Sequence, residues 1–274
     1  HWMGRAPYGS LETVSKINAR TLRTHHSRAW VSNRATIAVC GDVEGPAVKR
    51  LFDRLLKGWA PGKLLQPRKP KFPKRGVRVS LHEAQRRQAH LFLGHLGVRR
   101  SDPDYPALVV LDHVLGTGPG FTNRIARRLR DQLGLAYTVH ASISSSAGVS
   151  PGMFTAYIGT SPENVETAIG GFLDEMERIQ TEPVTEAELD LVKGYLIGSF
   201  PMGYERAARR ASYLIASHIH AFPDDYLETL PRAFEEVTPA DIQRAAKKHL
   251  HPQACCLSAS GPVKRATLKA ALRR

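Results

Sequence analysis

An arginine and a tyrosine seven residues apart, Arg130 and Tyr137, are the residues whose types and spacing best suit ligand chemistry. We expect Arg130 near the end of a basic helix and Tyr137 in the strand that follows. Gly134 would make the turn between them. A guanidinium and a phenol brought together could bind a substrate carbonyl or stabilise an oxyanion. The alternative is structural, with the arginine bonded to carbonyls at the helix end and the tyrosine packed on a sheet.

Twelve histidines invite a search for a metal site. The inverted zinc motif H-x-x-E-H does not occur, and the forward motif H-E-x-x-H begins at His82 but has Arg86 at its fifth position. Residues two apart on a helix point about 200° apart, so they cannot share a metal ion. The pairs excluded by such close spacing are His25 and His26, His218 and His220, and His249 and His251. We therefore expect no metal site in this chain.

Motifs for nucleotide binding or nucleophilic catalysis are also missing. Neither G-x-S-x-G nor a P-loop occurs, and the glycine-rich segment 116–120 follows an expected helix, whereas a phosphate-binding loop follows a strand. The three cysteines, Cys40, Cys255 and Cys256, form neither a C-x-x-C motif nor a disulfide framework.

The net charge of +14 is concentrated in one segment. From Arg54 to His82 there are nine Lys or Arg residues and no Asp or Glu, and only Trp59 and Phe72 are aromatic. A nucleic-acid-binding domain would present a basic face with interleaved aromatic residues, so we expect no nucleic-acid partner. The basic segment is either simply solvated or in contact with an acidic partner surface.

The first residue is His1 rather than Met, which suggests a fragment or a processed product. No charged segment followed by an apolar one occurs, so we expect no signal peptide in this sequence, and this favours a cytoplasmic location. No apolar run approaches about 18 residues, so we expect no membrane span.

Hydrophobic periodicity and turn residues predict the elements that would position the arginine and the tyrosine. Helices are expected over 10–30, 48–59, 104–115, 121–133, 162–180, 185–200, 204–221, 224–236 and 238–250. Strands are expected over 34–40, 77–81, 89–96, 136–143, 153–159 and 254–260. This order is not a regular β-α-β alternation. It predicts an α+β fold, an antiparallel sheet with helices packed on one face.

Several segments resemble one known family when read in order. They are ATIAVCGDV (35–43), AQRRQAHLFLGHLGVRRSDPDYPALVVLDHVLG (from 84), GFTNRIARRLRDQLGLAYTV (120–139), EAELDLVKGYLIGSFP (186–201) and VTPADIQRAAKKHL (237–250). Together they resemble the pitrilysin/insulinase-type zinc peptidases, the inverted-motif group that includes bacterial processing proteases and mitochondrial processing peptidase.

The resemblance implies an architecture of similar α+β units stacked in pairs. Residues 1–60 would be the trailing part of a zinc-type unit, and residues 61–75, basic and proline-rich, a linker. Residues 76–274 would be a complete second metallohydrolase-like unit, inactive and substrate-binding. The family's arginine–tyrosine pair falls on Arg130 and Tyr137, and in the family it helps hold substrate over the zinc. One departure is RDQL ahead of Gly134, which changes the charges around Arg130.

The function implied is that of a C-terminal portion of a zinc metalloendopeptidase, which binds peptide substrate and closes the chamber. Zinc and the catalytic glutamate would come from a missing N-terminal portion or a partner subunit, in a homo- or hetero-oligomer, and this chain would be inactive alone. The alternative is a non-catalytic scaffold or assembly subunit, which has no need of an arginine–phenol pair.

Overall fold

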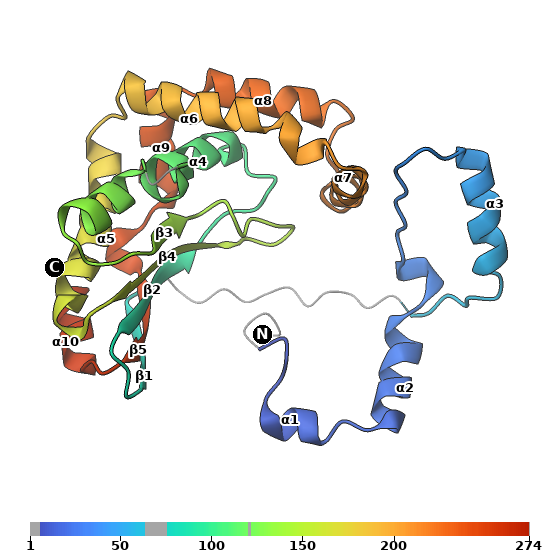
Figure 1. The fold of residues 1–274 in the computed structure, drawn as a ribbon, viewed down its shortest axis with the longest axis horizontal. Helices are drawn as coiled ribbons and strands as arrows, with labels where there is room; N and C mark the ends of the chain where they lie inside the picture. The colour runs from blue at the N-terminus through green and yellow to red at the C-terminus, as the bar shows by residue number, and fades with distance from the viewer. Residues whose placement is uncertain (1–5, 64–75, 120–121, 274) are drawn as a thin grey trace. The chain divides into compact units, whose positions relative to one another are not determined.

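The computed structural model describes residues 6–63, 76–119 and 122–273. Most of the expected linker, residues 64–75, therefore lies outside the described part of the chain. The chain divides into two compact units. One comprises His1–Pro73 with Arg206–Ile215, and the other comprises Lys74–Glu205 with Ala216–Arg274 (Figure 1).

The first unit consists of short helices with little buried surface. The expected helix 10–30 is two helices, α1 (Leu11–Ser15) and α2 (Ala19–Ala29), because Asn18 adopts an extended conformation and caps α2. A third helix, α3 (Gly45–Leu55), has Pro46 in its first turn. Among the described residues of this unit, Val31 is the one hydrophobic side chain that is buried.

The strand expected over 34–40 is wrong. A 3₁₀ turn (Ser32–Arg34) comes first, and no described residue of that run belongs to a strand. Its β-branched composition predicts a strand only where another strand offers backbone hydrogen bonds, and no partner strand lies within the described part of this unit. Asn33 instead holds the backbone of Gly62 through two reciprocal hydrogen bonds of 2.9 and 3.0 Å.

The second unit is built on a five-stranded sheet with the order β1-β5-β2-β4-β3. The strands are β1 (Arg78–Glu83), β2 (Ala89–Leu96), β3 (Val139–Ser142), β4 (Met153–Thr160) and β5 (Cys256–Gly261). All neighbours pair antiparallel except β1 with β5. The short connection between β1 and β2 reverses the chain, so β5, antiparallel to β2, must run parallel to β1.

Helices cover one face of this sheet, as the alternating burial along β2 and β4 shows (Figure 1). The long helix α5 (Val165–Thr181) packs on β2 and β4 and buries Ile169, Phe172 and Met176. The π-helical turn η3 (His113–Thr117) and the π-helix η5 (Ala126–Gln132) pack on β3. The α+β class, with helices on one face, is thus confirmed.

The other helices of the chain lie near their expected positions. They are α4 (Tyr105–Asp112), α6 (Glu186–Ser199), α7 (Ala207–His220), α8 (Tyr226–Glu236) and α9 (Pro239–His249). Of α7, the part up to Ile215 belongs to the first unit. A C-terminal helix, α10 (Arg265–Ala271), was not expected. None of the helices within the described ranges is long and apolar enough to cross a membrane.

Candidate functional site

The segment from η5 to β3 carries both residues singled out in the sequence. Arg130 lies in the last turn of η5, and Gly134 follows with a left-handed φ of 61°. The N–H of Gly134 donates to the carbonyl of Arg130 (3.1 Å), and that of Leu135 donates to Leu129 (2.8 Å). The turn at Gly134 is therefore present as expected, and it closes the helix end with backbone hydrogen bonds.

Tyr137 lies in a bend two residues before β3, so its expected place within a strand is wrong. Pairing with β4 begins only at Val139, which faces Ile158. The side chain of Tyr137 is 85% exposed, and its hydroxyl makes no hydrogen bond to the described residues. The alternative in which this tyrosine packs on the sheet does not fit such exposure.

The Arg130 side chain is about a quarter exposed, and its Nε donates to Asp131 Oδ1 at 2.8 Å. The backbone carbonyl of Arg130 accepts a hydrogen bond from the Gly134 N–H. At this carbonyl, the cap of the helix end is therefore a backbone group and not the arginine side chain. Arg130 and Tyr137 thus lie on one segment that leads from η5 through the turn at Gly134 to a bend before β3. The phenol hydroxyl is available as a donor at its exposed end.

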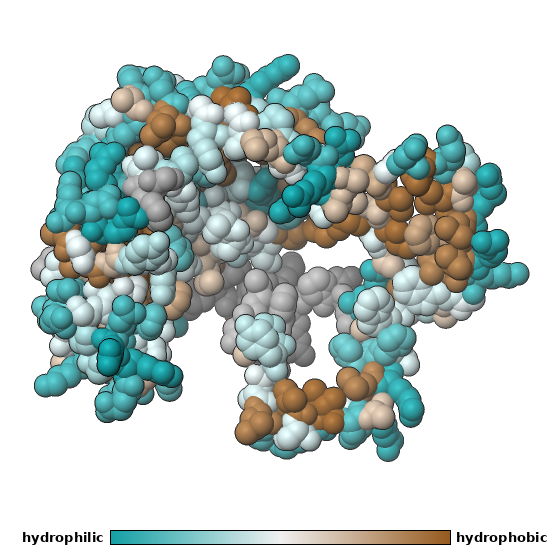
Figure 2. Space-filling model, viewed as in Figure 1, coloured by the Kyte–Doolittle hydropathy of each residue, from teal (hydrophilic) through white to brown (hydrophobic). Residues whose placement is uncertain are grey.

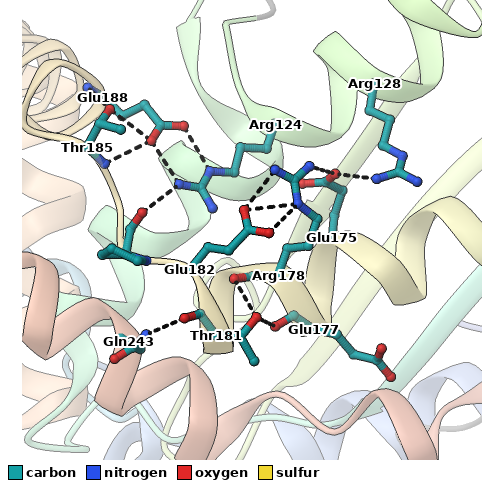
Figure 3. A network of polar contacts seen from close by, with 11 residues as sticks. Arg124, Arg128, Glu175, Glu177, Arg178, Thr181, Glu182, Thr185, Glu188 and Gln243 are labelled. Carbon is teal, nitrogen blue, oxygen red and sulfur yellow. Dashed lines mark hydrogen bonds and ion pairs between the residues drawn. The ribbon is translucent and has the colours of Figure 1, made fainter.

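Two arginines earlier in this segment, Arg124 and Arg128, tie it to the neighbouring helices (Figure 3). Arg124, just ahead of η5, forms a bidentate pair with Glu188 of α6, with both N···O distances 2.8 Å. The Arg124 hydrogen bonds lower the pKa of Glu188 to about 2, against the effect of its burial. Glu188 also accepts from the backbone and hydroxyl of Thr185, which caps α6.

The second tie runs from η5 to α5. Arg128 donates to Asp174 (2.8 Å) and to Glu175 (3.2 Å), and Glu175, with 1% of its side chain exposed, also accepts from Arg178 (2.9 Å). Arg178 in turn pairs with the exposed Glu182. All of these groups except Asp174 line a groove of about 580 Å³ between η5, α5 and the start of α6. The sequence pattern carries no signal for the pairs of Arg124 and Arg128, because 46 to 64 residues separate the partners.

Asp112 anchors the end of β3. This carboxylate, fully buried at the end of α4, accepts from the hydroxyl groups of Ser142 (2.6 Å) and Ser144 (2.5 Å). It also accepts from the backbone N–H groups of Ile143 and Ser144, both at 2.8 Å. Burial raises the pKa of Asp112, while these four donors oppose the rise. The strand after Tyr137 is therefore held from within the core.

One group of side chains could supply metal ligands. Asp102, Asp104 and His249 bring ligand atoms within 4.8 Å of one another, although 145 residues separate Asp104 from His249. Asp104 already accepts from Arg244 (2.6 Å), Lys248 (2.7 Å) and His249 (2.8 Å). Burial opposes ionisation, but these hydrogen bonds hold the pKa of Asp104 well below its usual range. Because two cations occupy the carboxylate, the group does not fit a catalytic zinc site.

Comparison with known proteins places the chain in a family. The model of the family described as "Peptidase M16 inactive domain" matches residues 16–196. An uncharacterized zinc protease of Mycobacterium bovis is 27% identical over 254 residues, which are 90% of this chain and 56% of that protein. A non-peptidase homolog of Helicobacter pylori is 22% identical over 253 residues, 90% of this chain and 56% of that protein.

The similarity extends to a eukaryotic protein and to a solved structure. Mitochondrial-processing peptidase subunit beta of Lentinula edodes is 21% identical, over 95% of this chain and 58% of that subunit. The crystal structure of a peptidase M16 inactive domain from Pseudomonas fluorescens superposes with a TM-score of 0.83 at 26% identity, over 94% of this chain and 61% of that one. This chain thus spans little more than half the length of its relatives. The resemblance to pitrilysin/insulinase-type peptidases is confirmed, and the chain belongs to the peptidase M16 inactive-domain family.

Proposed function

We propose that this chain is the substrate-binding and chamber-closing portion of a zinc metallopeptidase. The zinc and the catalytic glutamate would be held by another portion of the same protein or by a partner subunit. The family description, the zinc-protease relatives and the share of their length that this chain spans support the proposal. The observation that carries it is the exposed phenol of Tyr137, seven residues after Arg130 on a segment tied to the core on both sides.

In this role the two side chains bind the peptide around the bond to be cleaved. The Arg130 guanidinium would donate hydrogen bonds to a peptide carbonyl. The Tyr137 hydroxyl would donate a hydrogen bond to the oxygen on which negative charge develops during hydrolysis. Zinc in the other portion would supply activated water. No group of residues in the described part of this chain fits that metal. In this proposal the chain contributes by binding and orienting the peptide.

The first unit fits the same proposal. We propose that residues 1–60 complete a zinc-type unit, that 61–75 link the units, and that 76–274 form the substrate-binding unit. Apolar side chains remain exposed on α1 and α3, among them Leu11 (90%) and Leu55 (63%), and Figure 2 shows hydrophobic residues gathered there. Missing elements of the same unit would cover them.

The test uses the complete enzyme, formed by this chain with its zinc-bearing portion. Tyr137→Phe should lower kcat by about 10²–10³ without lowering the melting temperature, because one donor to the developing oxyanion is lost. Arg130→Ala should raise KM more than Arg130→Lys, which keeps the charge but loses the planar fork. Steady-state kinetics and thermal unfolding on the same samples measure both effects.

Matched controls come from the same chain. Tyr195→Phe removes the hydroxyl of a half-exposed tyrosine on α6, and Arg127→Ala removes an exposed arginine from η5 itself. Both should keep wild-type kinetics. Unchanged kcat and KM in both the Tyr137 and the Arg130 variants would show that the pair has no part in peptide hydrolysis.

A scaffold or assembly subunit is the second candidate, and the non-peptidase homolog of Helicobacter pylori favours it. A scaffold would assemble with its partners equally well in the Arg130 and Tyr137 variants. An H-x-x-E-H motif in the same protein or in a partner subunit, together with chelator-sensitive hydrolysis, would decide for the peptidase.

A further inference from the structure

One face of the five-stranded sheet is left open by the helices of its own unit. The pairing register places its outward side chains in rows across the strands. The central row is Ser80, Ser258, Phe92, Tyr157 and His140, and the row beside it is His82, Ser260, His90 and Gly159. On the other side of the central row lie Arg78, Cys256, Gly94 and Thr155.

The half of this face on β2, β4 and β3 carries an ordered aromatic row. Phe92 is 47% exposed, and its ring centroid lies 4.8 Å from that of Tyr157. His140 lies 5.3 Å from the same ring on the other side. The hydroxyl of Tyr157 is fixed by a 2.9 Å hydrogen bond with His90 Nδ1. Met153 and Leu96, which face each other in the register, extend the apolar surface along β2 and β4.

The other half, on β1 and β5, is polar, and its outward positions hold no carboxylate; Glu83, the last residue of β1, alternates to the other face. Its outward residues are small hydroxyl or thiol side chains, with Arg78 and His82 along the β1 edge. Across all five strands the outward positions hold Arg78 and three histidines, and neither Asp nor Glu occurs among them. An anionic side chain here meets a guanidinium, imidazoles and hydroxyl groups without repulsion, whereas a lysine or arginine finds no partner of opposite charge.

We propose that this open face binds an extended peptide in which an aromatic or aliphatic side chain is flanked by carboxylates. The apolar side chain would pack on Phe92 and Tyr157, and the carboxylates would meet Arg78 and the hydroxyl groups of β1 and β5. The inference rests on the proposed function in one respect, namely that the ligand is a peptide. It adds a preference for acidic over basic sequences, and a contact surface apart from Arg130 and Tyr137.

The test measures binding of fluorescein-labelled ten-residue peptides to the whole chain by fluorescence anisotropy. Three peptides differ only in composition: one has phenylalanine flanked by aspartates, one replaces the aspartates by lysines, and one replaces the phenylalanine by alanine. The acidic aromatic peptide should bind at least about tenfold more tightly than either of the others. Raising the salt concentration should lower the affinity for the acidic aromatic peptide.

Variants of the face sharpen the test. Phe92→Ser should lower the affinity for the acidic aromatic peptide about tenfold. Arg78→Glu should also lower that affinity, but it should not lower the affinity for the lysine peptide. Ser258→Glu places a carboxylate in the central row and should invert the preference between the two charged peptides. The matched controls are Leu191→Ser and Arg127→Glu, which remove an exposed leucine and an exposed arginine from α6 and η5. They should leave the affinities unchanged.

Several results would overturn the inference. Equal affinity for the acidic and basic peptides, or no loss in Phe92→Ser and Arg78→Glu while both remain folded by circular dichroism, would do so. A second copy of the chain would be the occupant if sedimentation showed dimers that Phe92→Ser abolishes. A nucleic acid would be the occupant if a single-stranded oligonucleotide bound this face more tightly than the peptides. Wild-type kcat and KM in the Arg130 and Tyr137 variants, together with the expected peptide binding to the open face, would refute the proposed function but not this inference.

Discussion

At the scale of single residues, the backbone at Gly134 decides where the candidate tyrosine lies. The chain leaves η5 through a left-handed conformation that L-residues other than glycine rarely adopt. A Cβ added there would meet no atom within 4 Å, so the requirement is one of backbone conformation and not of space.

Gly134→Ala should therefore destabilise the second unit by about 1 kcal/mol, through backbone strain alone. Gly194→Ala is the matched control, because Gly194 lies inside α6 and a Cβ there would also meet nothing within 4 Å. It should stabilise by about 0.5–1 kcal/mol, the helix propensity difference. Urea unfolding of the two variants measures both free energies, and changes of equal sign would contradict this reading of Gly134.

At the scale of elements, ion pairs fix η5 against α5 and α6. Glu188→Gln tests the pair with Arg124 with little disturbance elsewhere, because glutamine at this position keeps the capping box of α6. The pair is only partly exposed, so the substitution should cost about 1–2 kcal/mol at pH 7. The cost is measured as the change in the free energy of unfolding.

The pH dependence of that cost follows from the pKa of Glu188, lowered from 4.5 to about 2. A group whose folded pKa is lowered stabilises the fold above its unfolded pKa and loses that effect as pH falls towards the folded value. The difference between wild type and Glu188→Gln should be constant above about pH 5 and shrink between about pH 4.5 and 2. Glu182→Gln, which removes an exposed carboxylate that follows α5 and pairs with Arg178, should show a much smaller difference. A pH-independent cost would contradict the ion-pair explanation.

At the scale of the whole molecule, the two units differ in how much they bury. The second unit encloses a continuous core of sheet and helices, whereas the described residues of the first unit bury almost no hydrophobic side chain. Amide exchange in residues 6–63 of the isolated chain should therefore be much faster than in β2, β4 and α5. Hydrogen–deuterium exchange with mass spectrometry measures this. Comparable protection of the two units in a monomeric chain would contradict the incomplete-unit interpretation.

The sequence predicted most helices and their ends because the responsible interactions are local. Thr238 forms a capping box with Asp241, and Asn18 caps α2, each through residues three apart. The strand at 34–40 was wrong, since β-branched residues form a strand only with a partner. The bend at Tyr137 was missed for a related reason. Hydrophobic patterning predicts a strand over 136–143, but the pairing with β4 begins only at Val139.

The sequence by itself determined the family, the α+β class and the two candidate residues Arg130 and Tyr137, because motifs and periodic patterns are written in neighbouring residues. Only the tertiary structure decided the strand order, the partners of Arg124 and Asp104, and the row of Phe92, Tyr157 and His140. Each of these joins residues tens to more than a hundred positions apart. Such contacts form only when burial of the common core offsets the entropy of bringing distant segments together, and no local pattern encodes which segments meet.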